Sequence, residues 1–235
     1  MKLVLSCEHG GNEIPEQYSK YFKGQDKLLA SHRGWDIGAL AVAKSLSEHL
    51  KAPLFYATTS RLLVELNRSL HHPNLFSTIT KSLSKREKEE ILEAHYFPYR
   101  NKVKEQITSL LDNNDYILHI SVHSFTPELN GEVRNTDIGL LYDPSSHAEK
   151  DFSLRWKEQI NKSSLFRVRY NYPYRGIADG FTTYLRKQFP GKYAGIELEI
   201  NQALLLDKES IEKVSKLLTL SLKEINVSTL KTTGL

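Results

Sequence analysis

The sequence lacks the residues that mark several classes of protein. Its single cysteine, Cys7, excludes an intrachain disulfide and a cysteine-rich zinc knuckle, and it fits a reducing compartment. No stretch approaches the roughly 20 apolar residues of a membrane helix, and the apolar run after Met1-Lys2 is too short for a signal peptide. Internal repeats, low-complexity segments and flexible linkers are also absent. We therefore expect a soluble, cytoplasmic protein with no membrane partner.

Charge of one sign is not in large excess either. The 32 basic and 28 acidic residues give a formal net charge of +4 and are spread through the chain. This balance does not favour a nucleic-acid partner, but it is compatible with an anionic small molecule. Hydrophobic residues make up 40% of the 235 residues, which suits one sizeable domain or two small ones. We interpret residues 1–235 as a single domain with a loose tail over residues 228–235.

Short apolar runs alternate with amphipathic stretches along the chain, which is typical of an α/β sheet covered by helices on both faces. The predicted strands are 3–7, 54–58, 62–66, 116–122, 137–142, 166–170 and 193–200. The predicted helices are 37–50, 84–111, one that carries Phe152, Trp156 and Ile160, one that follows Gly180 to about residue 189, and 208–223. Phe97-Pro98 predicts a break within 84–111, because proline lacks the backbone donor that a helix interior needs.

Two histidines stand where predicted strands end. His9 follows the first apolar run and precedes Gly10-Gly11, which lets the backbone turn, and His123 follows the run 116–122. The carboxyl ends of strands in an α/β sheet are where sites form. Two neutral imidazoles and a carboxylate, with a position left open for water, are a recurrent hydrolytic zinc site. Each histidine alone is equally compatible with an exposed or hydrogen-bonded structural side chain, which is our interpretation of His119.

The last predicted strand carries carboxylates on a face that should be buried. Its alternation turns Glu197, Glu199 and Asn201 to the face opposite Ile196 and Leu198. Buried carboxylates are costly unless they meet a cation, a metal or water in a cleft. The pattern therefore favours a functional carboxylate here, although simple alternation in an edge strand would give the same sequence.

Ser124 and Cys7 are weaker candidates for a catalytic nucleophile, and Asp36 has a simple structural explanation. Ser124 has no G-x-S-x-G elbow, and it would point away from His123 if the strand continued. Cys7 lies in or beside an apolar strand, where free cysteines are usually inert. Asp36 stands at the start of the helix 37–50, where an aspartate commonly serves as an N-cap.

Four arginines are candidates for binding an anionic substrate. Arg61 and Arg68 bracket the predicted strand 62–66, while Arg134 and Arg175 lie in glycine-containing loops. A guanidinium can bind a substrate carboxylate in bidentate fashion or stabilise a developing oxyanion. An exposed arginine without such a role is the alternative, above all for Arg134.

Seven segments together give the chain a family resemblance. They are SCEHGGNEIP (6–15), RGWDIGA (33–39), SRLLVELNRS (60–69), VHSFTP (122–127), RNTDIGLLYDP (134–144), NYPYRGIADG (171–180) and GIELEINQ (195–202). In chain order, from the N-terminus to about Gln202, they resemble the N-formylglutamate amidohydrolase family. This resemblance implies a single three-layer αβα domain with a mixed, mostly parallel central sheet, similar to the zinc carboxypeptidases and aspartoacylases.

The resemblance also implies a metal site. The expected ligands of one zinc ion are His9, Asp36 and His123. The His-x-x-Glu motif of the wider relatives would instead place a carboxylate close behind His9, where Asn12 occupies that spacing and Glu13 follows. The sequence therefore leaves open whether Asp36 or Glu13 is the carboxylate ligand, and it leaves open the native metal.

The expected reaction is hydrolysis of the amide bond of an N-acyl acidic amino acid, in particular N-formyl-L-glutamate to formate and L-glutamate. A zinc-activated water would attack, with Glu199 as the general base. Arg68 or Arg61 would stabilise the oxyanion. The residues expected to hold this small anionic substrate are Arg61, Asn67, Asn171, Arg175 and Arg134. One alternative is an enzyme that acts on another N-acyl amino acid or a small peptide. A second is a non-catalytic binding protein on the same fold. The oligomeric state stays open.

Overall fold

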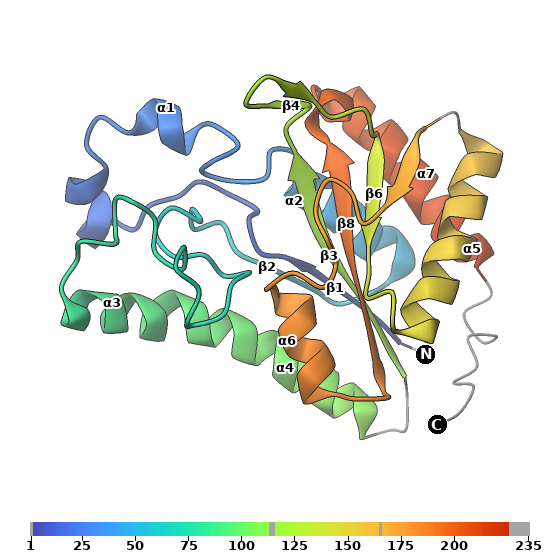
Figure 1. Ribbon diagram of the computed structural model, residues 1–235, viewed down its shortest axis with the longest axis horizontal. Helices are drawn as coiled ribbons and strands as arrows, with labels where there is room; N and C mark the ends of the chain where they lie inside the picture. Colours follow the sequence, from blue (N-terminus) through green and yellow to red (C-terminus); the bar gives the residue numbers. More distant parts are fainter. Residues whose placement is uncertain (1, 113–115, 165, 226–235) are drawn as a thin grey trace.

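The computed structural model describes residues 2–112, 116–164 and 166–225 (Figure 1). The predicted tail over residues 228–235 lies outside these residues. The helical segments are the 3-10 turns Glu16–Phe22 and Gln202–Leu204, α1 Asp26–Leu29, α2 Ala39–Leu50, α3 Lys85–Ile91, a π-helical turn Leu92–Tyr96, α4 Phe97–Leu111, α5 His147–Ser163, α6 Phe181–Gln188 and α7 Lys208–Glu224. Among the described residues, no helix is long and apolar enough to cross a membrane.

A six-stranded sheet forms the centre of the molecule. Its strands, in the order in which they pair, are β2 Leu54–Tyr56, β1 Lys2–Cys7, β3 Ile117–Phe125, β8 Tyr193–Asn201, β6 Ile138–Leu141 and β7 Val168–Tyr170. The first four are parallel, β6 is antiparallel to β8, and β7 is parallel to β6. A separate two-stranded hairpin is formed by β4 Glu128–Leu129 and β5 Glu132–Val133. The predicted α/β class and the mixed, mostly parallel sheet are confirmed.

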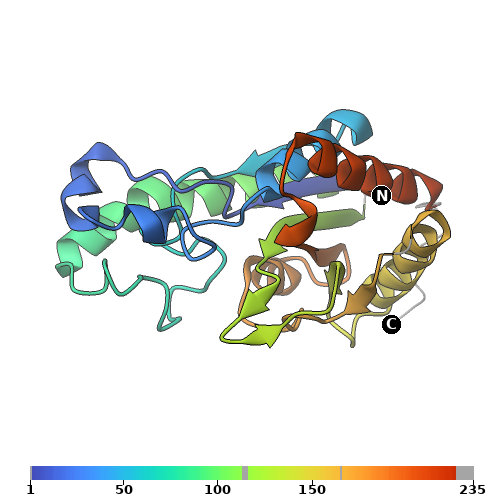
Figure 2. The ribbon, with the colours of Figure 1, turned by 90° about the horizontal axis from the view of Figure 1, so that it is seen from above.

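Helices cover both faces of the sheet, as Figure 2 shows from above. One core packs α2, α5 and α7 against one face, with Leu46, Trp156 and Leu218 fully buried. The other packs α4 and α6 against the opposite face, with Ile107 and Phe181 fully buried. The three layers expected from the sequence are therefore present.

Two predicted elements were wrong. Residues 62–66 form turns instead of a strand, and Thr80 Oγ1 binds the backbone carbonyls of Leu62 at 3.3 Å and Leu63 at 3.1 Å in place of a neighbouring strand. The helix 84–111 is not broken near Pro98. A π-helical turn directly precedes Phe97-Pro98, and the chain stays helical from α3 through α4.

The sheet brings the polar ends of three strands together. β3 lies between β1 and β8, and His123 is the register partner of Glu199. All nine residues of β8 are buried, and this strand is central, which rules out the edge-strand explanation for its two glutamates. Ile196 and Leu198 pack into the core under α2, α5 and α7, while Glu197 and Glu199 face the other side.

Candidate active site

His9 and His123 meet at the end of the parallel strands. His9 follows β1, where Gly11 passes so close to Thr58 that a Cβ on the glycine would lie 2.5 Å from the Thr58 carbonyl oxygen. His123 lies within β3, which continues to Phe125, beyond the predicted end at residue 122. The two imidazole centroids are 5.1 Å apart, and the two residues are only 2% and 3% exposed. The structure therefore brings the two histidines together in the interior.

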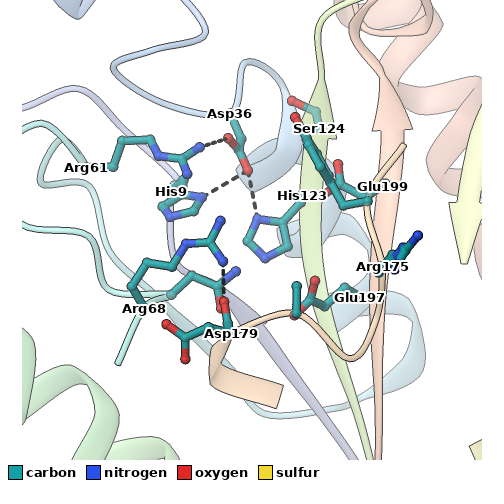
Figure 3. A pocket seen from close by; sticks show the side chains of 13 residues that line it. His9, Asp36, Arg61, Arg68, His123, Ser124, Arg175, Asp179, Glu197 and Glu199 are labelled. Carbon is teal, nitrogen blue, oxygen red and sulfur yellow. Dashed lines mark hydrogen bonds and ion pairs between the residues drawn. The ribbon is translucent and has the colours of Figure 1, made fainter. Parts of the chain in front are cut away.

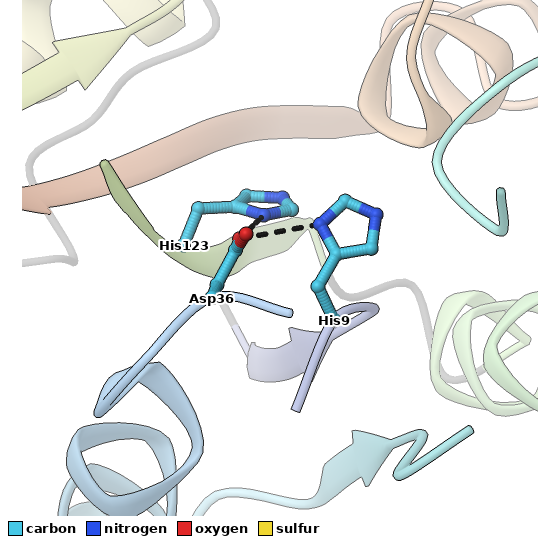
Figure 4. Close-up of side chains that lie close together, drawn as sticks. All are labelled: His9, Asp36 and His123. Carbon is cyan, nitrogen blue, oxygen red and sulfur yellow. Dashed lines mark hydrogen bonds and ion pairs between the residues drawn. The ribbon is translucent and has the colours of Figure 1, made fainter. Parts of the chain in front are cut away.

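Asp36 joins the two histidines into one group (Figure 4). Its Oδ2 lies 3.2 Å from His9 Nδ1 and 2.8 Å from His123 Nδ1. The backbone N–H of Asp36 donates to the carbonyl of His9 at 3.0 Å, which fixes the loop before α2. Gly38 occupies the N-cap of α2 without a side-chain cap, so the cap expected as an alternative role for Asp36 is not formed. One donor atom from each of the three residues lies within 4.8 Å of the others, an arrangement that can hold a metal ion.

Two buried glutamates that sequence reasoning missed lie next to the Nε2 atoms of the histidines. Glu65 contacts His9 Nε2 and accepts from Arg61 Nε at 2.8 Å. Glu8 lies 3.2 Å from His123 Nε2. Only two features of the sequence pointed to these glutamates. Glu65 lies four residues after Arg61, and Glu8 lies beside His9, and each feature is common without a functional role.

These carboxylates are held in the ionised form. Burial alone would raise the pKa of Asp36, but the charge of His9 and the hydrogen bond from His123 outweigh it and lower this pKa well below its usual range. For Glu65, burial is outweighed by the positive charges of Arg61 and His9, which lower its pKa. For Glu8, burial is outweighed by the hydrogen bond and charge of His123.

The donor set fits a divalent cation. Three ionised carboxylates and the Arg61 guanidinium sum to a net charge of −2, which two protonated imidazoles balance in the metal-free protein and which a divalent cation would balance beside neutral imidazoles. A neutral imidazole has one N–H, yet both nitrogens of His9 face carboxylates. Tetrahedral zinc donors, each about 2.0–2.2 Å from the ion, lie about 3.4 Å apart, close to the spacing of Asp36 from both Nδ1 atoms.

Glu199 is an unusual carboxyl group beside this site (Figure 3). It is 5% exposed, and its Oε2 has no hydrogen-bond partner among the residues that the structure describes. Burial, assisted by the negative charges of Asp36 and Glu197, raises the pKa of Glu199 to about 8, although the charge of His123 opposes the shift. Glu197, by contrast, accepts a hydrogen bond from Thr182 Oγ1 at 2.8 Å.

A pocket of about 300 Å³ opens onto these groups. Of the residues predicted for the site, it is lined by His9, Asp36, Arg61, Asn67, Arg68, His123, Arg175 and Glu199. Ser124, Tyr174, Ala178, Asp179 and Glu197 complete the lining. Sequence reasoning had assigned no role to Tyr174 or Asp179, because the path of the loop 171–180 over the pocket could not be inferred from its composition.

Two predicted substrate-binding residues lie outside the lining. Arg134 is buried, packs over the ring of Tyr174 at 5.3 Å, and donates to the Tyr174 hydroxyl at 3.2 Å. The side-chain oxygen of Asn171 accepts from the backbone N–H groups of Tyr142 at 3.1 Å and Gly176 at 2.9 Å. Both residues therefore shape the pocket wall and the loop 171–180.

The pocket arginines differ in how far their guanidinium groups are already bound. Arg61 is held by Glu65 and lies 3.3 Å from Asp36 Oδ1. Arg68 donates through one nitrogen, Nη1, to the backbone carbonyl of Asp179. Asn67 accepts from the backbone N–H of Phe181 at 2.7 Å, which ties this segment to the start of α6.

The remaining alternatives are resolved by their contacts. Ser124 donates its hydroxyl to the carbonyl of Ile37 at 2.8 Å, and Cys7 is fully buried, which raises the pKa of its thiol. His119 lies between the hydroxyls of Tyr193 and Ser6, at 2.6 and 2.7 Å, which confirms it as buried structural polarity. Glu13 is exposed and accepts from Thr58 Oγ1 at 2.6 Å, away from the metal-binding group.

The fold and the pocket together define an α/β protein with an enzyme-like site at the carboxyl ends of its parallel strands. The chain belongs to the N-formylglutamate amidohydrolase family, whose sequence profile matches residues 1–206. This membership supports amide hydrolysis of a small substrate as its activity. A comparison with curated proteins gave no match.

Two solved structures share the fold. The gene product Atu2144 from Agrobacterium tumefaciens is 28% identical, with a TM-score of 0.82 over 95% of this chain and 91% of that chain. The N-formylglutamate amidohydrolase from Ralstonia eutropha JMP134 is 17% identical, with a TM-score of 0.69 over 94% of this chain and 91% of that chain. These likenesses agree with the fold, and the profile match over residues 1–206 confirms the family resemblance of the sequence.

Proposed function

We propose that the protein is a metal-dependent amidohydrolase, with zinc as the metal, that cleaves N-formyl-L-glutamate to formate and L-glutamate. The observation that carries this proposal is the placement of His9, Asp36 and His123 beside the unpartnered carboxyl of Glu199, in a pocket that Arg68 and Arg175 also line. Family membership supports the reaction class. The small pocket supports a substrate of the size of a single acylated amino acid.

His9, Asp36 and His123 would hold the ion. When bound, zinc would activate water and polarise the acyl oxygen. Glu13 has no part in this proposal, because its carboxylate is exposed and engaged by Thr58. Iron, cobalt or manganese could occupy the same donors, so the native metal is a question for metal analysis.

Glu199 is the proposed general base. Its unpartnered Oε2 and its raised pKa support a carboxyl that takes a proton from water and returns it to the leaving amine. The water oxygen adds to the formyl carbon, and Glu199 then passes the proton to the amide nitrogen. The C–N bond breaks, and glutamate leaves with a neutral amine. Glu197 is less suited to this role, because Thr182 already donates to it.

Arg68 is the better candidate for the oxyanion. Arg61 is committed to Glu65 and Asp36, whereas a single protein contact, to Asp179, holds the Arg68 guanidinium among the described residues. Arg175 and Asn67 line the same pocket and would bind the substrate carboxylates. Direct substrate contact by Asn171 and Arg134 stays a prediction, and so does a cytoplasmic location.

The test combines metal analysis of the purified protein with amine release from N-formyl-L-glutamate, N-acetyl-L-glutamate, N-formyl-L-methionine and a dipeptide. We expect stoichiometric metal and the fastest release from N-formyl-L-glutamate. Faster release from another substrate would change the acyl group or amino acid and keep the reaction. Absence of bound metal, with no activity restored by added zinc, would contradict the proposal as a whole.

A further inference from the structure

The two histidines of the metal-binding group are arranged in the same way. Each turns Nδ1 towards Asp36 Oδ2 and Nε2 towards a second buried carboxylate. The second carboxylate is Glu65 for His9 and Glu8 for His123. Both are nearly inaccessible to solvent, at 6% and 0% exposure, so neither is placed to contact a substrate directly.

Glu65 is itself fixed on three sides. Arg61 binds its Oε2 through Nε at 2.8 Å and Nη2 at 2.5 Å, and the backbone N–H of Asn67 donates to Oε1 at 3.0 Å. Oε1 also faces His9 Nε2. The guanidinium therefore balances the charge of Glu65 and leaves one oxygen directed at the imidazole.

Glu8 is fixed by a different set of donors. Tyr99 donates to its Oε1 at 2.8 Å, and Ser121 donates to its Oε2 at 2.5 Å. Ser121 Oγ also lies 2.8 Å from His123 Nε2, so the hydroxyl and the carboxylate together surround that nitrogen. Tyr99 comes from α4 and Ser121 from β3, which ties the contact to the core of the fold.

A neutral imidazole that donates its Nε2–H to a carboxylate keeps its lone pair on Nδ1. A carboxylate that accepts from the distal nitrogen fixes the tautomer and the ring orientation, and it makes the imidazole a stronger ligand. We propose that Glu65 and Glu8 are positioning residues that hold His9 and His123 in the Nε2–H tautomer, so that both histidines bind the metal through Nδ1. This inference rests on the metal site of the proposed function, but it does not depend on the substrate.

The test measures zinc affinity by competition with a chromophoric chelator for wild type, Glu65→Gln, Glu8→Gln and Glu13→Gln. Glutamine keeps the size of each side chain and removes its charge. We expect each of the first two variants to bind zinc about 10- to 100-fold more weakly. Glu13→Gln is the matched control, because Glu13 lies in the same N-terminal stretch but its carboxylate is exposed, and its affinity should equal that of wild type.

A second measurement needs no variant and so does not depend on whether the glutamine proteins fold. Long-range ¹H–¹⁵N spectra of zinc-loaded wild type should show both histidines with a protonated Nε2 and a metal-bound Nδ1. Metal binding through Nε2 of either ring, or glutamine variants that fold and bind zinc as tightly as wild type, would overturn the inference. A wild-type protein that binds no metal would overturn the proposed function along with it, whereas intact metal binding without formylglutamate hydrolysis would leave the inference standing.

Discussion

His119 and His123 lie on the same face of the same strand, four residues apart, and both are buried. Their surroundings differ. Hydroxyls of Ser6 and Tyr193 flank His119, and burial lowers its pKa to about 4. Carboxylates of Asp36 and Glu8 flank His123, and although burial opposes it, their hydrogen bonds and charges raise its pKa well above the usual value. The partners, and not the burial, separate a structural histidine from a site histidine.

Substitution of the two histidines should give the largest contrast. We expect His123→Ala to weaken zinc binding by more than about 100-fold, because loss of a ligand should exceed the loss caused by its supporting groups. His119→Ala should keep zinc affinity within a few-fold but lower the free energy of unfolding by about 2–4 kcal/mol, because it removes the hydrogen-bond partner that two buried hydroxyls share. Chelator competition and urea denaturation measure the two effects. Equal losses of zinc affinity in both variants would erase the distinction.

Glu199→Gln tests the carboxyl that faces the site without a partner. We expect kcat to fall about 10²- to 10⁴-fold with zinc still bound, because a proton acceptor is lost and no ligand is removed. Glu197→Gln is the control from the same strand face, and it should reduce kcat less. Full activity of Glu199→Gln with metal bound would exclude Glu199 as the base.

Glu199→Gln should lower activity but raise the stability of the metal-free protein at neutral pH. The folded-state pKa of Glu199, about 8, lies above its ordinary value of 4.5, so ionisation opposes folding as the pH rises from 4.5 to 8. Metal-free Glu199→Gln should therefore melt several degrees above metal-free wild type at pH 7 to 8, and the difference should vanish near pH 4. A lower melting temperature at pH 7 would contradict the raised pKa.

Arg68 and Arg61 offer a smaller contrast within the pocket. Arg68→Lys should lower kcat/KM about 10- to 100-fold with unchanged zinc affinity, because a lysine cannot reproduce the planar donors of a guanidinium. Arg61→Lys should instead weaken zinc binding, since Arg61 holds Glu65. Steady-state kinetics and chelator competition on both variants would show the reverse assignment if Arg61, and not Arg68, contacts the reacting group.

The loss of stability at acid pH should give the smallest effect. The pKa of His119 is lowered from 6.5 to about 4, so this group stabilises the fold above pH 6.5, and that stability is lost as the pH falls from 6.5 towards 4. In His119→Asn the fall between these pH values should be shallower by up to about 1.4 kcal/mol per pH unit. Urea titrations at several pH values measure the slope, and an unchanged slope would show that His119 is not buried as a neutral ring.

The sequence predicted the parts of the site that lie within or close to a strand or helix. The hydrophobic runs place His9, His123 and Glu199 near strand ends, although β3 and β8 each continue two residues beyond His123 and Glu199, and the family motifs point to Asp36. Glu65 was missed because residues 62–66 were taken for a strand, whereas they form turns bound by Thr80. Local patterns carry no information about such a distant partner.

The loops account for the remaining differences. The path of residues 171–180 depends on contacts between distant segments, such as that of Asp179 with Arg68 and Ser69. The composition of these loops does not show that Arg134 Nη1 donates to Tyr174 or that Asn171 Oδ1 accepts from two backbone N–H groups, and direct substrate contact by the two residues stays a prediction. Glu8 was passed over because a glutamate beside a strand is ordinarily exposed.

The most direct test of the account is a crystal structure of the zinc-loaded protein with data collected on both sides of the zinc absorption edge. The account predicts one strong anomalous peak, within bonding distance of His9 Nδ1, His123 Nδ1 and a carboxylate oxygen of Asp36. A peak at any other set of residues, or zinc absent from this group in protein that hydrolyses its substrate, would contradict it.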